Sequence, residues 1–134
     1  MSVFRYLIIF ISIYAAVTSC GYRDNYKIFG WVSLPEGVEE IETREQWLPN
    51  GDGYKIVRYA VDLEQYAELD KSMRKWRHQK LPVDKVRDTL IFEYVKKSDI
   101  GIYVYHTYKN DPTNFELLVL DSTRMELISF VSIQ

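Results

Sequence analysis

Apolar residues between positions 62 and 82 recur with the period of an α-helix. Their spacing alternates between three and four residues, which places one set of side chains on a common face: Tyr66, Leu69, Met73 and Trp76. Asp62 and Gln65 form a capping-box-like pair at the start, and Pro82 marks the end. The pattern predicts one long amphipathic helix. Acidic residues fill its first half and basic residues its second half, as the helix dipole favours.

Extended patterns flank this helix. Residues 27–34 have an extended pattern, and residues 54–61, rich in β-branched and aromatic side chains, predict a strand. Four further runs after the helix predict an antiparallel meander, because a parallel crossover takes about a dozen residues and their connections are shorter. These runs are Thr89–Lys97, Ile102–Lys109, Phe115–Asp121 and Met125–Ile133.

Residues 38–48 fit two patterns. Val38, Ile41 and Leu48 match a loose helical stripe, whereas alternation from Ile41 to Trp47 matches a strand. The turn signal at residues 49–53 precedes the strand at 54–61, so a hairpin is favoured, and both interpretations stay open.

Together these elements predict an α+β fold, with one long helix packed on an antiparallel meander sheet of about five to six strands. The order of strand, long helix and four strands over residues 54–133 is similar to the cystatin-like architecture. This similarity is one of topology. The chain lacks the Gln-Val-x-Val-Gly loop of cystatin inhibitors, so no inhibitory activity follows from it.

The N-terminal segment predicts where the protein is found. Arg5 precedes an apolar run from Tyr6 to Val17 that only Ser12 interrupts, which is typical of a secretory signal peptide. The run ends in Val17-Thr18-Ser19-Cys20, which resembles the lipobox of bacterial lipoproteins. That resemblance implies cleavage before Cys20, a diacylglyceryl group on its thiol, and acylation of the new amino terminus. The expected organisation is a signal peptide at 1–19, a lipidated tether at 20–26 and a single domain at 27–134.

Other interpretations of this segment are a plain secreted protein, a membrane anchor and a buried helix. An anchor needs about 20 apolar residues, and this run is shorter, with Arg23 and Asp24 close behind it. The expected location is the cell membrane or outer membrane, lipid-anchored and facing the periplasm or exterior. Gly21 stands where lipoproteins retained in the inner membrane of enteric-type bacteria carry Asp, which favours the outer membrane where one exists.

Charge and composition exclude some partners. The formal net charge is −2 at pH 7, whereas nucleic-acid binding calls for a concentrated basic surface. Cys20 is the only cysteine, so neither a disulfide framework nor, once it is lipidated, thiol chemistry is expected. Aromatic residues make up 15% of the chain and can supply a hydrophobic core that does not depend on a disulfide.

Catalytic and metal-binding motifs are missing from the sequence. It contains no His-x-His, His-Glu-x-x-His, Cys-x-x-Cys or calcium-loop pattern, and no glycine-rich loop precedes a helix. Of the two histidines, His106 alternates with sheet-facing positions, and His78 lies in a basic run that the helix dipole explains. The sequence therefore predicts no metal, no cofactor and no enzymatic activity.

Two groups of residues are candidates for an interaction surface. Arg74, Trp76 and Arg77 form a basic end to the predicted helix that could contact anionic headgroups, although the helix dipole explains the charges without a partner. Tyr103 and Tyr105 share one face of a predicted strand and suit stacking on sugars or proteins, although tyrosine also has high strand propensity.

These features favour a non-enzymatic cell-envelope lipoprotein that acts as a binding module at the membrane surface. Its partner would be another envelope protein or a surface component. The alternative is an inhibitor or immunity-type lipoprotein that blocks an extracytoplasmic hydrolase or toxin. A monomer is expected. Because Met125–Ile133 is apolar on both alternations, a dimer through this strand is the alternative if the chain itself does not cover it.

Overall fold

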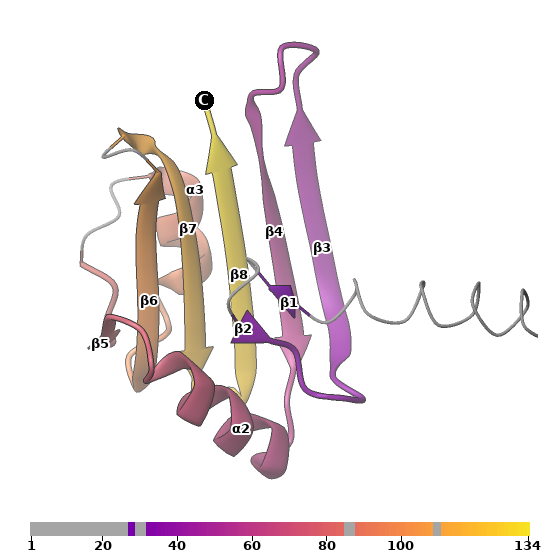
Figure 1. Cartoon of the computed structure of the whole chain (residues 1–134), viewed down its shortest axis with the longest axis vertical. Coiled ribbons are helices and arrows are strands. Elements are labelled where there is room, and N and C mark those ends of the chain that lie inside the picture. Colours follow the sequence, from indigo (N-terminus) through magenta and orange to yellow (C-terminus); the bar gives the residue numbers. More distant parts are fainter. Residues whose placement is uncertain (1–26, 29–31, 85–87, 109–110) are drawn as a thin grey trace, which may run out of the picture.

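The computed structural model describes residues 27–28, 32–84, 88–108 and 111–134, and its centre is a six-stranded antiparallel sheet (Figure 1). The strands of this sheet are β3 (Glu39–Trp47), β4 (Gly53–Ala60), β5 (His78–Lys80), β6 (Gly101–Tyr108), β7 (Asp111–Asp121) and β8 (Glu126–Ile133). Their order across the sheet is β3-β4-β8-β7-β6-β5. A separate two-stranded ribbon pairs β1 (Lys27–Ile28) with β2 (Val32–Ser33). The helices are α2 (Leu63–Met73) and α3 (Thr89–Val95).

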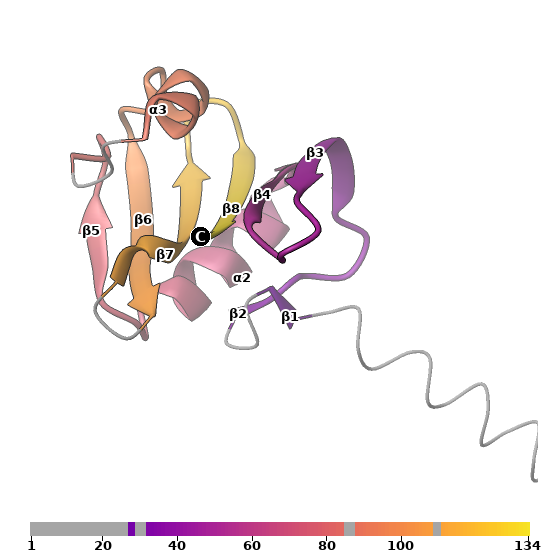
Figure 2. The same ribbon diagram turned by 90° about the horizontal axis from the view of Figure 1, so that it is seen from above.

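Elements cover both faces of the sheet. Helix α2 and the β1–β2 ribbon lie on one face, and α3 lies on the opposite face (Figure 2). Alternation along β7 divides the core accordingly: Leu118 and Leu120 pack with α2, whereas Leu117 and Val119 pack with α3. The α+β class and the antiparallel sheet expected from the sequence are confirmed.

Helix α2 is shorter than its apolar pattern predicts. The capping box forms, since the Asp62 side chain accepts from the Gln65 backbone N–H and the Gln65 side chain accepts from the Asp62 N–H. The helix ends at Met73, so the prediction of one long helix is wrong. The chain turns after Arg74, and residues 78–80 form strand β5. Their backbone groups pair with β6 instead of continuing the hydrogen bonds of the helix.

The predicted strand Thr89–Lys97 is instead helix α3, and the strand prediction is wrong. Asp88 caps the helix, because its Oδ1 accepts the N–H groups of Leu90 (2.8 Å) and Ile91 (3.2 Å). Ile91 and Val95, four residues apart, are both buried against the sheet. Burial of this helical face outweighs the strand propensity of β-branched and aromatic residues, which depends strongly on context.

The remaining strand predictions agree with the structure. Residues 39–47 form a strand, and the hairpin interpretation of residues 38–48 is confirmed by the pairing of β3 with β4. The other three predicted runs correspond to β6, β7 and β8 within a few residues at their ends. Strand β8 lies between β4 and β7 and contributes buried residues to both faces, so the cover that its apolar sequence requires comes from the chain itself.

Candidate functional site

Tyr103, proposed from the sequence as part of an exposed surface, is buried. Only 1% of the residue is exposed, on the face of β6 that packs with α3. Its hydroxyl lies 2.6 Å from Gln79 Oε1 and 2.7 Å from Asp84 Oδ1. Burial, followed by the hydrogen bond to Asp84, raises the pKa of Tyr103 to about 12. This tyrosine is a core residue with a satisfied polar end, and its assignment to the interaction surface is wrong.

Tyr105 belongs to the same packed layer. Its ring is half-buried, with its centroid 5.5 Å from that of Phe115, and Phe115 in turn stacks on Phe130 at 5.6 Å. Tyr54 continues the row at 6.2 Å from Phe130. Much of the tyrosine pattern therefore fills the core beside α3, in agreement with the strand-propensity interpretation.

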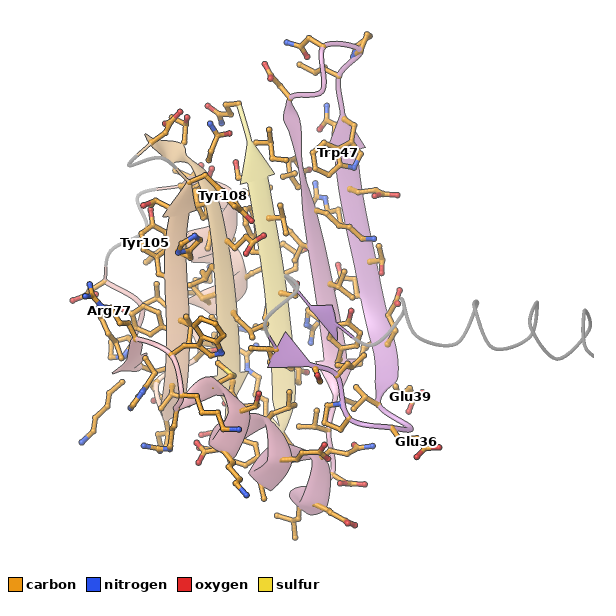
Figure 3. The ribbon with its side chains drawn as sticks, in the orientation of Figure 1. Glu36, Glu39, Trp47, Arg77, Tyr105 and Tyr108 are labelled. Carbon is orange, nitrogen blue, oxygen red and sulfur yellow. The ribbon has the colours of Figure 1, made fainter. Side chains whose placement is uncertain are left out.

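Arg74, Trp76 and Arg77 come together at the end of α2 and in the turn that follows it. Arg74 caps the helix, and its Nε lies 2.8 Å from Asp70 Oδ2. Trp76 is 45% exposed, and Arg77 is exposed as well (Figure 3). Tyr103 is buried, so it does not share an exposed surface with these three residues. Cys20, the predicted lipidation site, lies outside the described residues.

His106 lies on the sheet face predicted for it, together with Tyr108. The two rings meet edge to face with their centroids 5.4 Å apart, and both residues are exposed. The Tyr108 hydroxyl donates to Glu116 Oε1. Partial desolvation of the hydroxyl, followed by this hydrogen bond, raises the pKa of Tyr108 to about 12. Among the described residues, no group of three or more His, Cys, Asp or Glu side chains is placed to hold a metal ion.

Strand β3 is the most exposed regular element of the described sheet. It forms one edge, and none of its nine residues is buried. Apolar side chains are nevertheless present at this edge, with exposed fractions of 47% for Ile41, 43% for Trp47 and 54% for the adjacent Leu48. An edge strand presents unpaired backbone N–H and C=O groups, so β3 offers a template for a further strand.

The β3 edge is also acidic. Its side chains include one cation, Arg44, and four carboxylates: Glu39, Glu40, Glu42 and Glu45. Glu42 holds the strand in place, because it accepts hydrogen bonds from Arg58 Nη1 and the Tyr94 hydroxyl, each at 2.9 Å. These bonds, that of Arg58 foremost, lower the pKa of Glu42. Trp47 is oriented by a 3.1 Å hydrogen bond from its Nε1 to Glu45 Oε2.

The two edges of the sheet differ. Strand β5 has three residues, whereas β3 has nine. A β-bulge at Ile41 interrupts the pairing of β3 with β4, and the register is continuous from Glu42 to Trp47. Bulges and charges are common protections of an edge, but neither accounts for three exposed apolar side chains. The sequence indicated the hairpin of β3 and β4. It could not indicate that β8 would pair with the other side of β4, which leaves β3 at the edge of the sheet.

No protein-family model, curated protein or solved structure matches this chain. The described part of the chain contains no helix that is both long and apolar enough to cross a membrane.

Proposed function

We propose that this protein is a non-enzymatic, lipid-anchored interaction module of the cell envelope that binds an extended segment of another protein along β3. The observation that carries the proposal is a nine-residue edge strand without a buried residue, beside which Ile41, Trp47 and Leu48 are exposed. An extended segment added to such an edge gains main-chain hydrogen bonds, and its side chains meet those of the edge strand.

The charges of β3 define the chemistry of the partner. Three carboxylates, those of Glu39, Glu40 and Glu45, are exposed along the edge, against the single cation Arg44. Opposite charges on paired strands stabilise the pairing, and like charges oppose it. A segment with alternating basic and apolar side chains fits this edge better than an acidic segment. The continuous register from Glu42 to Trp47 sets the length over which regular pairing is available.

The anchor rests on the sequence of residues 1–20. A membrane or outer-membrane location, facing the periplasm or exterior, would keep the domain near its partners, because a flexible tether of n residues spans about 5–6 Å × √n. The cystatin-like arrangement remains a proposal about topology alone. The succession of β4, α2 and the strands β6 to β8 along the chain supports it, whereas β5 and α3, which the expected order lacks, depart from it.

Cys20→Ser is expected to abolish lipid attachment, because a serine hydroxyl cannot form the thioether. Metabolic labelling with a fatty-acid analogue measures this. Ser12→Ala, which leaves the lipobox-like residues unchanged, is the matched control and should keep its label. Undiminished label on Cys20→Ser would contradict the anchor and leave the β3 proposal to be judged separately.

Charge reversal at the edge should weaken binding of a cationic strand. The probe is a synthetic peptide of alternating lysine and valine, long enough to span β3, and binding is followed by tryptophan fluorescence. Glu40→Lys with Glu45→Lys is expected to weaken binding by about tenfold or more, equivalent to about 1.4 kcal/mol. Glu64→Lys with Glu68→Lys, which changes the same number of exposed charges on α2, is the control.

Two further measurements separate strand addition from simple charge attraction. A peptide N-methylated along the edge that pairs with β3 should bind poorly, because it cannot donate its main-chain hydrogen bonds. Equal binding of the methylated peptide would contradict strand addition. Sedimentation of the protein alone tests the expected monomer. A concentration-dependent dimer that disappears in the Glu40→Lys/Glu45→Lys variant would assign the edge to a second copy of the chain.

A further inference from the structure

A cleft lined by polar and apolar side chains lies at the edge of the sheet opposite β3. It is enclosed by the C-terminal half of α2, by β5 and by the loop that precedes β6, and its volume is about 400 Å³. Leu81 and Ile102, both buried, contribute apolar lining. A volume of this size is at the lower end of the range for small-molecule sites, about 300–1,000 Å³.

Basic side chains from two different elements line this cleft. Arg74 comes from the end of α2, and His78 and Lys80 come from β5. In the sequence these residues form one basic run that the dipole of a long helix explains. The helix ends at Met73, however, so this explanation does not extend to His78 and Lys80. Asp99 is the carboxylate among the described lining residues, so the cations outnumber it.

The strand conformation of β5 is what brings His78 and Lys80 together. Alternate residues of a strand point to the same side, so these two share one side, and Gln79 points to the other. Gln79 accordingly lies against the buried Tyr103 hydroxyl, at 2.6 Å. Both His78 and Lys80 are exposed and line the cleft, so both side chains are accessible to a ligand.

Arg74 and His78 make contacts within the protein that orient their side chains, and each side chain has further polar atoms that a ligand can contact. Arg74 uses Nε for its bond to Asp70, at 2.8 Å, and a guanidinium has further N–H donors on its two Nη atoms. His78 Nδ1 lies 3.2 Å from the Trp76 carbonyl oxygen. This contact involves Nδ1, and Nε2 is the second polar atom that the ring can offer to a ligand.

Hydroxyl groups complete the polar lining. Ser122 Oγ donates to the Ile100 carbonyl at 3.0 Å, and Tyr66 lines the cleft as well. Burial, ahead of the nearby charge of Asp70, raises the pKa of Tyr66, so this hydroxyl stays neutral. Cationic donors and neutral hydroxyls converging on one cleft are the groups that recognise phosphate oxygens.

We propose that this cleft binds a phosphate group, with Arg74 and Lys80 as its cationic contacts and His78 as a further polar contact. The phosphate can belong to a soluble phosphate ester or to the headgroup of an anionic lipid, since both present the same oxygens. The site lies at the opposite edge of the sheet from β3 and does not depend on the function proposed for that strand.

The test uses the full chain in micelles of a non-ionic detergent. It is titrated with inorganic phosphate, with glycerol 3-phosphate, and by doping the micelles with phosphatidylglycerol. Amide chemical shifts report where each probe binds. We expect shifts at Gly101 and Ser122, which line the cleft, and at the backbone of β5. A response to the two soluble probes assigns the site to a phosphate ester, and a response only in doped micelles assigns it to a lipid headgroup.

Charge-removing variants decide whether the cleft is responsible. His78→Gln with Lys80→Gln is expected to weaken the response by about tenfold or more. Lys55→Gln with Lys97→Gln, which removes two exposed lysines outside the cleft, should change it by less than about twofold. All four positions are exposed, and matching melting temperatures verify that the variants fold. Equal responses in both variants, shifts spread over the surface, or no response to any probe would overturn the proposal.

Discussion

Met73→Ala is expected to lower the free energy of unfolding by about 2–5 kcal/mol, which is the usual cost of truncating a buried methionine. Met73 is fully buried at the end of α2, where it packs in the same cluster as Leu69, Leu118 and Leu120. The total stability of a small domain is about 5–15 kcal/mol, so the loss is severe. Urea unfolding monitored by circular dichroism measures it.

Trp76→Ala provides the matched comparison. Trp76 continues the same apolar spacing in the sequence, but it follows the end of the helix and is 45% exposed. Its truncation therefore removes less buried surface, and we expect a loss well below that of Met73→Ala. Equal losses for the two variants would show that the helix extends to Trp76 and that its ring lies in the core.

Asp121→Ala should also be strongly destabilising, by about 3 kcal/mol, because it removes a buried carboxylate that several donors share. Asp121 is fully buried at the end of β7. Its Oδ1 accepts the backbone N–H groups of Thr123 (2.9 Å) and Arg124 (3.1 Å), and its Oδ2 accepts the Ser98 hydroxyl (2.8 Å). Ser98 is itself fully buried, so the variant leaves its hydroxyl without this acceptor.

Asp111→Ala is the control for that loss. Asp111 makes a similar turn, with Oδ1 accepting the Thr113 N–H at 2.9 Å and the Thr113 hydroxyl at 2.6 Å. It is only partly buried, so water can replace those bonds, and its truncation should cost less. Thermal unfolding compares the two. A control variant as unstable as Asp121→Ala would show that turn geometry, and not the buried network, sets the cost.

Local signals predicted the start of α2 but not its end. Asp62 and Gln65 form their capping box within four residues, so nothing outside that segment is needed to specify it. The end depends on whether residues 78–80 continue the helix or pair with β6, and that choice involves Val104, far along the chain. The strand prediction for Thr89–Lys97 failed for the same reason. Ile91 and Val95 fit a helix only because the sheet supplies an apolar surface for that face.

The interaction surface depended even more on tertiary structure. Tyr103 and Tyr105 alternate as expected in β6, yet their face is the one that α3 covers, and α3 was not predicted. Ile41 and Trp47 could be assigned to a strand, but their exposure follows from the position of β3 at the edge. In the sequence, a helix dipole explains the basic run that contains His78 and Lys80. In the structure both residues belong to β5 and line a cleft.

The central position of β8 has a consequence for when the domain can form. In the order β3-β4-β8-β7-β6-β5, this strand alone joins the β3–β4 hairpin to the three strands on its other side. It also follows every other strand of the described sheet along the chain, so the two halves of the sheet do not pair until residues 126–133 have been synthesised. Pairing β4 with β8 closes a long loop, exemplified by Arg58 and Glu126, and such closure is entropically costly. The β3–β4 hairpin and the pairing of β6 with β7 can form before then, whereas the complete six-stranded sheet forms only once β8 is available.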